Sequence, residues 1–143
     1  AFPLINKALE KNEDIPHYLE LKADILLGLE KLEEASALYL HIIQFNHSTP
    51  YYLSKYAYIT AIRYGLDEAI SLIDKGISDY HHPSLHFHKS ILYFIFEKEE
   101  EAYHEFAVGL EYDFSSHTVV FDKLPEMKNN PRLQMLISLY EED

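Results

Sequence analysis

The apolar residues of the chain recur at helical spacing over most of its length, and short polar stretches separate the segments that carry them. Few runs alternate polar with apolar residues in the way that half-buried strands do. Leu, Ala, Glu, Lys, Ile and Tyr are abundant, and this mixture favours helices. The pattern therefore predicts an all-α protein.

Two sequence markers divide the chain at nearly constant spacing. Prolines separated by 34 and 33 residues stand at Pro16, Pro50 and Pro83. Acidic triplets of the form Asp/Glu-Glu-Ala have the same separations, and they end at Ala35, Ala69 and Ala102. Because two markers share one register, we interpret the period as a stack of helical pairs.

Each period carries the residues that a packed helical pair needs. Proline opens the first helix, where its missing N–H has no intrahelical partner to lose. A small residue follows seven positions later, at Ala23, Ala57 and Ser90. In the second helix a large residue comes four positions after the triplet alanine, at Tyr39, Ile73 and Phe106. Three positions further on stand Ile42, Gly76 and Gly109. Small residues at these places would let neighbouring helices approach closely, and the large ones would fill the space between them.

This pattern resembles the tetratricopeptide repeat family in the small residue of the first helix, the alanine and large residue of the second, and the junction proline. The resemblance covers residues 1–114 and implies a right-handed solenoid of helical hairpins. It divides that range into a half repeat and three repeats, over residues 1–15, 16–49, 50–82 and 83–114. The third repeat departs from the family, because His86 and Lys89 stand where apolar residues are usual.

The two ends of the chain differ from the repeats. Residues 1–15 match only a second helix, so we expect the chain to be a fragment of a longer repeat protein. Residues 115–143 leave the period and are predicted to form C-terminal capping helices. A short helix is expected over residues 115–123, ended by Pro125. The last helix should open at Asn130-Pro131 and bury a face formed by Leu133, Leu136, Ile137 and Tyr140.

Composition narrows the class of function. The 143 residues fit one domain, and the net charge of −12 repels nucleic-acid backbones while favouring basic partners. Without cysteine, the chain has no disulfide, no Cys-ligated zinc and no thiol nucleophile. No apolar run approaches the ~20 residues of a membrane span. We expect a cytoplasmic protein that binds no nucleic acid and has no membrane span, and whose oligomeric state the sequence leaves open.

Histidines and carboxylates are the candidates for chemistry. Four histidines lie within eight residues, at His81, His82, His86 and His88. Only His82 and His86 have the i, i+4 spacing of a two-ligand metal site, and His82 precedes a proline at a helix start. The acidic run of residues 97–101 is interpreted as a solvated turn. We therefore predict no catalytic residues, no metal and no cofactor, and the chain is not expected to be an enzyme.

The family resemblance also implies a binding surface. In that family the first helices line a concave groove at fixed offsets from the junction proline. These offsets place in the groove His17, Glu20, Asp24, Tyr51, Ser54, Tyr58, Phe87 and Ile91, with Phe94 as a further candidate. The alternative is that the aromatic and aliphatic members belong to the core instead. None of the offsets used by family members that grip a peptide carboxylate is basic here, so that mode of binding is disfavoured.

The expected function is a scaffold that binds a protein or peptide in an acidic, aromatic groove. A segment that carries apolar and basic residues would suit such a groove best. The alternative is a recruiting or regulatory part of a larger enzyme or regulator whose active domain lies outside this chain.

Overall fold

In the computed structural model, residues 16–45 and 50–141 are described, and they contain helices and turns but no strand. The prediction of an all-α protein is thereby confirmed for these residues. The longer helices are α2 (Pro16–Gly28), α3 (Leu32–Phe45), α4 (Pro50–Tyr64), α5 (Leu66–Tyr80), α6 (Leu85–Ile95), α7 (Glu99–Asp113) and α9 (Pro131–Tyr140). Shorter ones are η1 (Phe114–Ser116), α8 (Thr118–Lys123) and η2 (Pro125–Asn129).

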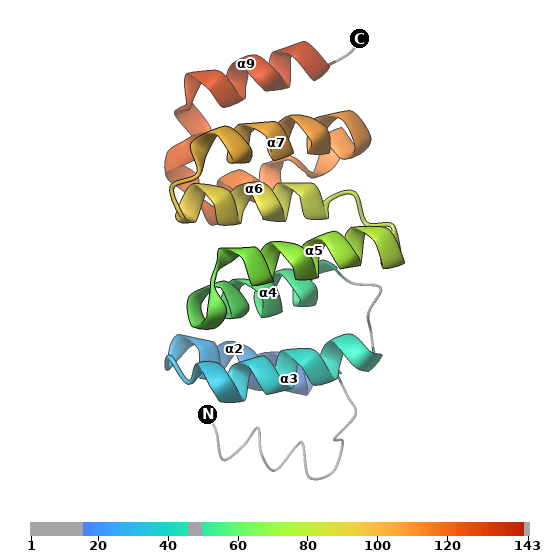
Figure 1. The fold of residues 1–143 in the computed structure, drawn as a ribbon, viewed down its shortest axis with the longest axis vertical. Helices are drawn as coiled ribbons and strands as arrows, with labels where there is room; N and C mark the ends of the chain where they lie inside the picture. The colour runs from blue at the N-terminus through green and yellow to red at the C-terminus, as the bar shows by residue number, and fades with distance from the viewer. Residues whose placement is uncertain (1–15, 46–49, 142–143) are drawn as a thin grey trace. The chain divides into compact units, whose positions relative to one another are not determined.

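The chain forms two compact units, residues 1–69 and 70–143, and the boundary falls inside α5. In the first unit α2 packs against α3, and α3 packs against α4; the first of these pairs is seen side by side in Figure 1. The alanines that the period assigns to helix contacts, Ala23, Ala35, Ala57 and Ala69, are all fully buried. Tyr39 and Ile42 fill the interior beside them.

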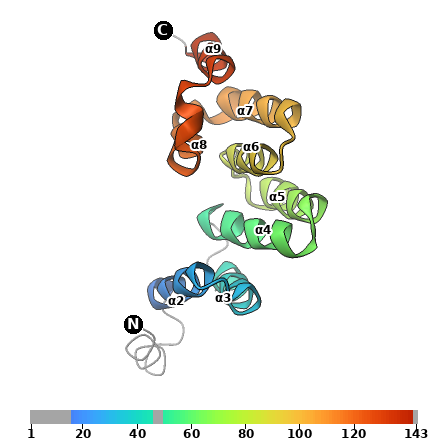
Figure 2. The ribbon, with the colours of Figure 1, turned by 90° about the vertical axis from the view of Figure 1, so that its left-hand side faces the viewer.

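In the second unit α6 packs against α7, and the C-terminal segment covers both helices. Figure 2 shows α8 beside α6 and α9 beside α7, in agreement with their contacts. The core of this unit consists of Phe87, Ile91, Phe106, Leu110, Val120 and Leu133. Gly109 is required here, because a Cβ on it would lie 2.7 Å from two ring carbons of Phe87.

Two of the helical hairpins close with the same turn. Glu30 after α2 and Glu97 after α6 both adopt the left-handed conformation, with φ of 61° and 60°. In each turn the next residue's N–H donates to a carbonyl five residues back, from Lys31 to Leu26 at 2.9 Å and from Lys98 to Tyr93 at 2.7 Å. This is the hydrogen bond of a Schellman ending, and it satisfies a carbonyl that the helix leaves free.

The C-terminal helices follow the predicted pattern. The short helix expected over residues 115–123 is formed by η1 and α8, and Val120 of α8 is fully buried. Asn130 caps α9, since its side chain accepts from the N–H of Leu133 at 3.0 Å. The Asn130 amide also donates to the Tyr103 hydroxyl of α7 at 2.9 Å, which fixes the start of α9 on that helix.

Candidate functional site

The first unit joins two carboxylates of α2 to tyrosines of the following helices. The Tyr39 hydroxyl of α3 donates to Oδ1 of Asp24. The Tyr52 hydroxyl of α4 donates to Oε1 of Glu20 at 3.3 Å. Burial raises the pKa of Tyr39 far above its ordinary value, and the hydrogen bond to Asp24 raises it further. The phenols therefore stay protonated and act as donors, while the carboxylates supply the negative charge.

Tyr51 of α4 lies half-buried beside these carboxylates. Burial, followed by the negative charges of Asp24 and Glu20, raises the pKa of Tyr51 to about 12. Its ring makes an edge contact with Tyr52, with centroids 5.4 Å apart. The ammonium of Lys55 lies 5.3 Å from the centroid of the Tyr51 ring, so one cation already sits over this aromatic surface.

The structure brings five of the eight predicted groove residues onto the first unit. They lie on α2 and α4, half-buried, and are Glu20, Asp24, Tyr51, Ser54 and Tyr58. We call this set the α2–α4 surface. The Ser54 hydroxyl donates to the backbone carbonyl of Tyr51 at 2.7 Å, which uses its proton within the helix. The side chain of His17 lies outside the described part of the chain.

Phe87 and Ile91 were wrongly expected in the groove. Phe87 is fully buried and Ile91 is 7% exposed, and both belong to the core of the second unit. The physical reason is the contact with α7: the ring of Phe87 lies on Gly109 and meets the ring of Phe106 edge-on, with centroids 5.5 Å apart. The offsets that leave polar residues half-buried in α2 and α4 thus point into the core in α6. Phe94 is partly buried and packs against the same core.

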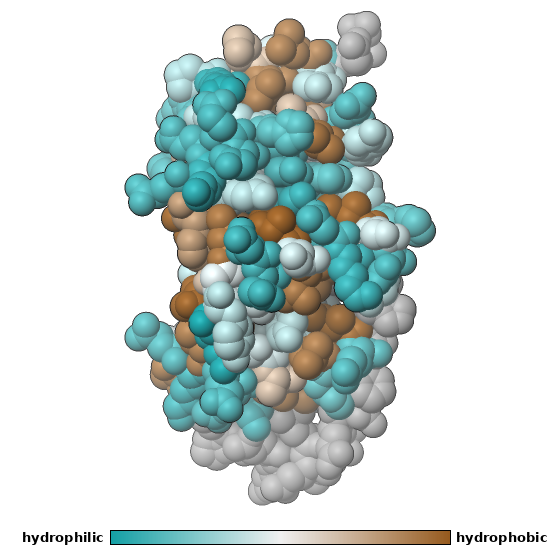
Figure 3. Space-filling view, viewed as in Figure 1, coloured by the Kyte–Doolittle hydropathy of each residue, from teal (hydrophilic) through white to brown (hydrophobic). Residues whose placement is uncertain are grey.

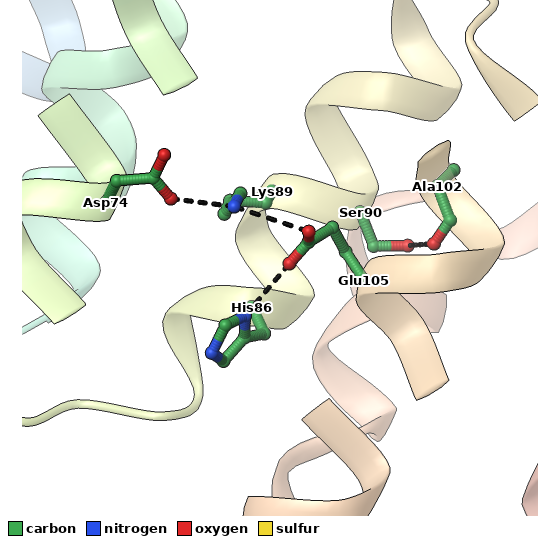
Figure 4. A network of polar contacts seen from close by, with 6 residues as sticks. All are labelled: Asp74, His86, Lys89, Ser90, Ala102 and Glu105. Carbon is green, nitrogen blue, oxygen red and sulfur yellow. Dashed lines mark hydrogen bonds and ion pairs between the residues drawn. The ribbon is translucent and has the colours of Figure 1, made fainter. Parts of the chain in front are cut away.

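Polar residues of α5, α6 and α7 form a network in the second unit (Figure 4). Lys89 of α6 is buried, and its Nζ lies 2.7 Å from Oδ1 of Asp74 and 3.3 Å from Oε2 of Glu105. His86 Nδ1 lies 2.8 Å from the other Glu105 oxygen and donates to it, since a carboxylate only accepts. The Ser90 hydroxyl donates to the carbonyl of Ala102 at 2.8 Å beside them.

The electrostatics of this network favour its charged form. Burial alone would raise the pKa of Glu105, but the hydrogen bond from His86 and the charge of Lys89 hold it below its usual value. Burial alone would lower the pKa of Lys89, yet Asp74 and Glu105 raise it above the ordinary value. A buried lysine is tolerated because two carboxylates compensate its charge. We interpret the network as a set of ion pairs and hydrogen bonds that holds α5, α6 and α7 together.

A further feature of the second unit, an open depression, could not be predicted from the sequence. The end of α6, the start of α7 and η2 enclose an open depression, with Phe94, Ile95, Leu124 and Met127 among its lining residues. The acidic run of residues 97–101 lies on its edge. That run was interpreted as a solvated turn, and its residues are indeed exposed. Only contacts between segments about 30 residues apart reveal the apolar side chains next to it.

Comparison of the chain with protein-family models, with curated proteins and with solved structures found no match. The resemblance to the tetratricopeptide repeat family therefore stays a prediction. Within residues 16–45 and 50–141, no helix is both long enough and apolar enough to cross a membrane. In the same ranges no three His, Asp or Glu side chains are grouped so as to hold a metal ion.

Proposed function

We propose that this chain is a helical-repeat scaffold, similar to tetratricopeptide repeat proteins, that binds a protein or peptide segment carrying basic and apolar residues. The observation that carries the proposal is the agreement between the period and the interior. The three large residues at the same repeat position, Tyr39, Ile73 and Phe106, are all fully buried. So are the small residues of the first helices, Ala23, Ala57 and Ser90.

A shared turn supports the same proposal. The first and third hairpins close at Glu30 and Glu97 with left-handed residues, although nothing in the side chain of glutamate requires that conformation. Equal interiors and equal turns are what repetition of one helical unit produces. A right-handed solenoid of these units is part of the proposal.

The α2–α4 surface supplies the chemistry for binding. It combines the carboxylates of Glu20 and Asp24 with the half-buried rings of Tyr51 and Tyr58. Tyrosine offers a large contact area at a low cost in side-chain entropy, and the carboxylates complement a cation. The position of Lys55 over the Tyr51 ring shows that a cation can lie on these rings. We therefore place the bound segment on this surface.

Selection from a displayed library of random peptides on the immobilised full chain tests the proposal. We expect enrichment of peptides that combine Lys or Arg with Leu or an aromatic residue. The variant Tyr58→Ala should retain fewer of the enriched peptides than the wild type, whereas Tyr64→Ala, which removes a 66% exposed tyrosine from the same helix, should retain as many. Selection that enriches no sequence, or that enriches acidic peptides, would refute the proposal.

A further inference from the structure

The depression on the second unit has an apolar floor. Its lining spans the end of α6, the start of α7 and η2, and it encloses about 870 Å³ of open space. Phe94, Leu124 and Met127 pack with one side against the core of the unit. Ile95 is 41% exposed and adds an aliphatic surface that the rest of the unit does not cover. The floor can therefore receive apolar side chains from outside.

The edge of the depression is acidic. Five carboxylates line it, from Glu97, Glu99, Glu100, Glu101 and Glu126, against the single ammonium of Lys98. Arg132 pairs with Glu100 through two contacts of 2.8 and 3.1 Å. The other four glutamates are exposed. Figure 3 shows polar side chains over the left-hand end of α7 and apolar ones over the end of α6 beneath it.

This distribution of charge favours one kind of ligand for the depression over others. The first turn of α7 already holds three glutamates, which occupy the place that an anion would take at a helix N-terminus. A second copy of the chain would bring a net charge of −12 to an acidic edge. A segment with lysines or arginines around an apolar face meets both the floor and the edge with complementary groups.

We propose that this depression, which we call the α6–α7 pocket, docks a basic amphipathic segment of a partner protein. The apolar side chains of the segment lie on Phe94, Ile95 and Met127, and its cations lie against the glutamates of the edge. The pocket is a second binding surface in addition to the α2–α4 surface, and it is carried by different residues.

Fluorescence anisotropy with the full chain tests this docking. The probe is a labelled synthetic peptide of about 14 residues, with leucines at i, i+3, i+4 and i+7 and lysines between them. Neutralising the edge with Glu99→Gln plus Glu101→Gln should weaken binding about fivefold at low salt, because two facing charges are lost. Added salt should weaken peptide binding to the wild-type chain and reduce the difference in affinity between the wild type and this variant.

A matched pair of substitutions separates docking from attraction to net charge. Glu33→Gln plus Glu34→Gln removes the same charge from the first turn of α3, also at exposed positions, and should change binding less than about twofold. Ile95→Ser alone should also weaken peptide binding, while Leu139→Ser, at a 67% exposed leucine of α9, should leave it unchanged.

Several results would overturn the α6–α7 pocket as a docking site. These are equal weakening by the two glutamine pairs, no effect of Ile95→Ser, and no binding of the peptide to the wild-type chain. A loss of binding that follows from Tyr58→Ala and from none of the substitutions in the pocket would also overturn it, while supporting the α2–α4 surface. When the peptide binds the wild-type chain, each proposal is therefore tested by its own substitutions. Circular dichroism melting of every variant checks that each remains folded.

Discussion

The close contact between Gly109 and Phe87 predicts that a side chain at position 109 lowers the stability of the fold. A Cβ on Gly109 would lie 2.7, 2.7 and 2.9 Å from three ring carbons of Phe87, where carbon atoms normally stay about 3.5 Å or more apart. The ring would have to move by almost 1 Å. The Phe87 ring is fully buried and packs against Phe106, so there is little free space into which it could move.

Two opposing terms set the effect of Gly109→Ala. Alanine inside a helix is about 1 kcal/mol more favourable than glycine. Overpacking a core costs about 1–3 kcal/mol, and the upper part of that range applies where the neighbour is a buried aromatic ring. The net change is a loss of about 1–2 kcal/mol in the free energy of unfolding. At about 3 °C for each kcal/mol, the melting temperature should fall by roughly 3–6 °C.

Thermal melting followed by circular dichroism measures this, and Gly28→Ala provides the control. Gly28 is the last residue of α2 and has no foreign atom within 4 Å of an added Cβ, so alanine there should leave stability equal or higher. In a Phe87→Leu background, which removes the ring, Gly109→Ala should become neutral or stabilising. If Gly109→Ala melts at or above the wild-type temperature, the packing of α6 on α7 described above is wrong.

Two further predictions concern buried charge. Lys89→Met leaves the Glu105 carboxylate, which is 12% exposed, without its ammonium partner, so the free energy of unfolding in urea should fall by about 2 kcal/mol. Lys75→Met, which breaks an exposed pair with Asp79, should change the free energy of unfolding far less. Burial and then the charge of Lys123 lower the pKa of His88 to about 4, so the unfolded chain binds a proton between pH 6.5 and 4 that the folded chain does not. Stability should therefore fall by about 2 kcal/mol from pH 7 to pH 5 on account of this residue, and His88→Gln should flatten that part of the pH profile; an unchanged profile would contradict the burial of the ring.

Much of the interior could be predicted from the sequence, because small and large residues recur at regular spacing along the chain and are buried. Ala23 and Ala57 were expected where neighbouring helices approach closely, and both are fully buried. The last helix was expected from the proline and its apolar spacing, and Leu133 is buried as predicted. In both places local pattern and packing agree, and that agreement is what makes a prediction from sequence succeed.

The burial of α6 side chains could not be predicted, because it depends on partners from other helices. Lys89 occupies an apolar position and is buried only because Asp74, on α5, and Glu105, on α7, lie within reach of its ammonium. Phe87 turns inward because Gly109, 22 positions later, leaves room for its ring. The left-handed turn at Glu97 carries no sequence signal either, since glycine or asparagine usually marks that conformation.

The candidate surfaces were predictable to different degrees. The family offsets placed Glu20, Asp24 and Tyr51 together, and these residues lie side by side. The two carboxylates accept hydrogen bonds from tyrosine hydroxyls. The α6–α7 pocket was not predicted. Its floor joins Phe94 of α6 to Met127 of η2, and only the packing of the C-terminal segment on α6 and α7 brings these residues together.

The central claim is that the chain binds a basic, apolar segment on defined surfaces. Titration of the isotope-labelled full chain with the leucine–lysine peptide, followed by two-dimensional nitrogen–proton NMR, tests it most directly. We expect saturable shifts of amide signals around Glu20, Ser54 and Tyr58, and around Ile95 and Glu101, with the core signals unmoved. Spectra that stay unchanged at saturating peptide, or shifts spread evenly over exposed acidic residues of every helix, would contradict it.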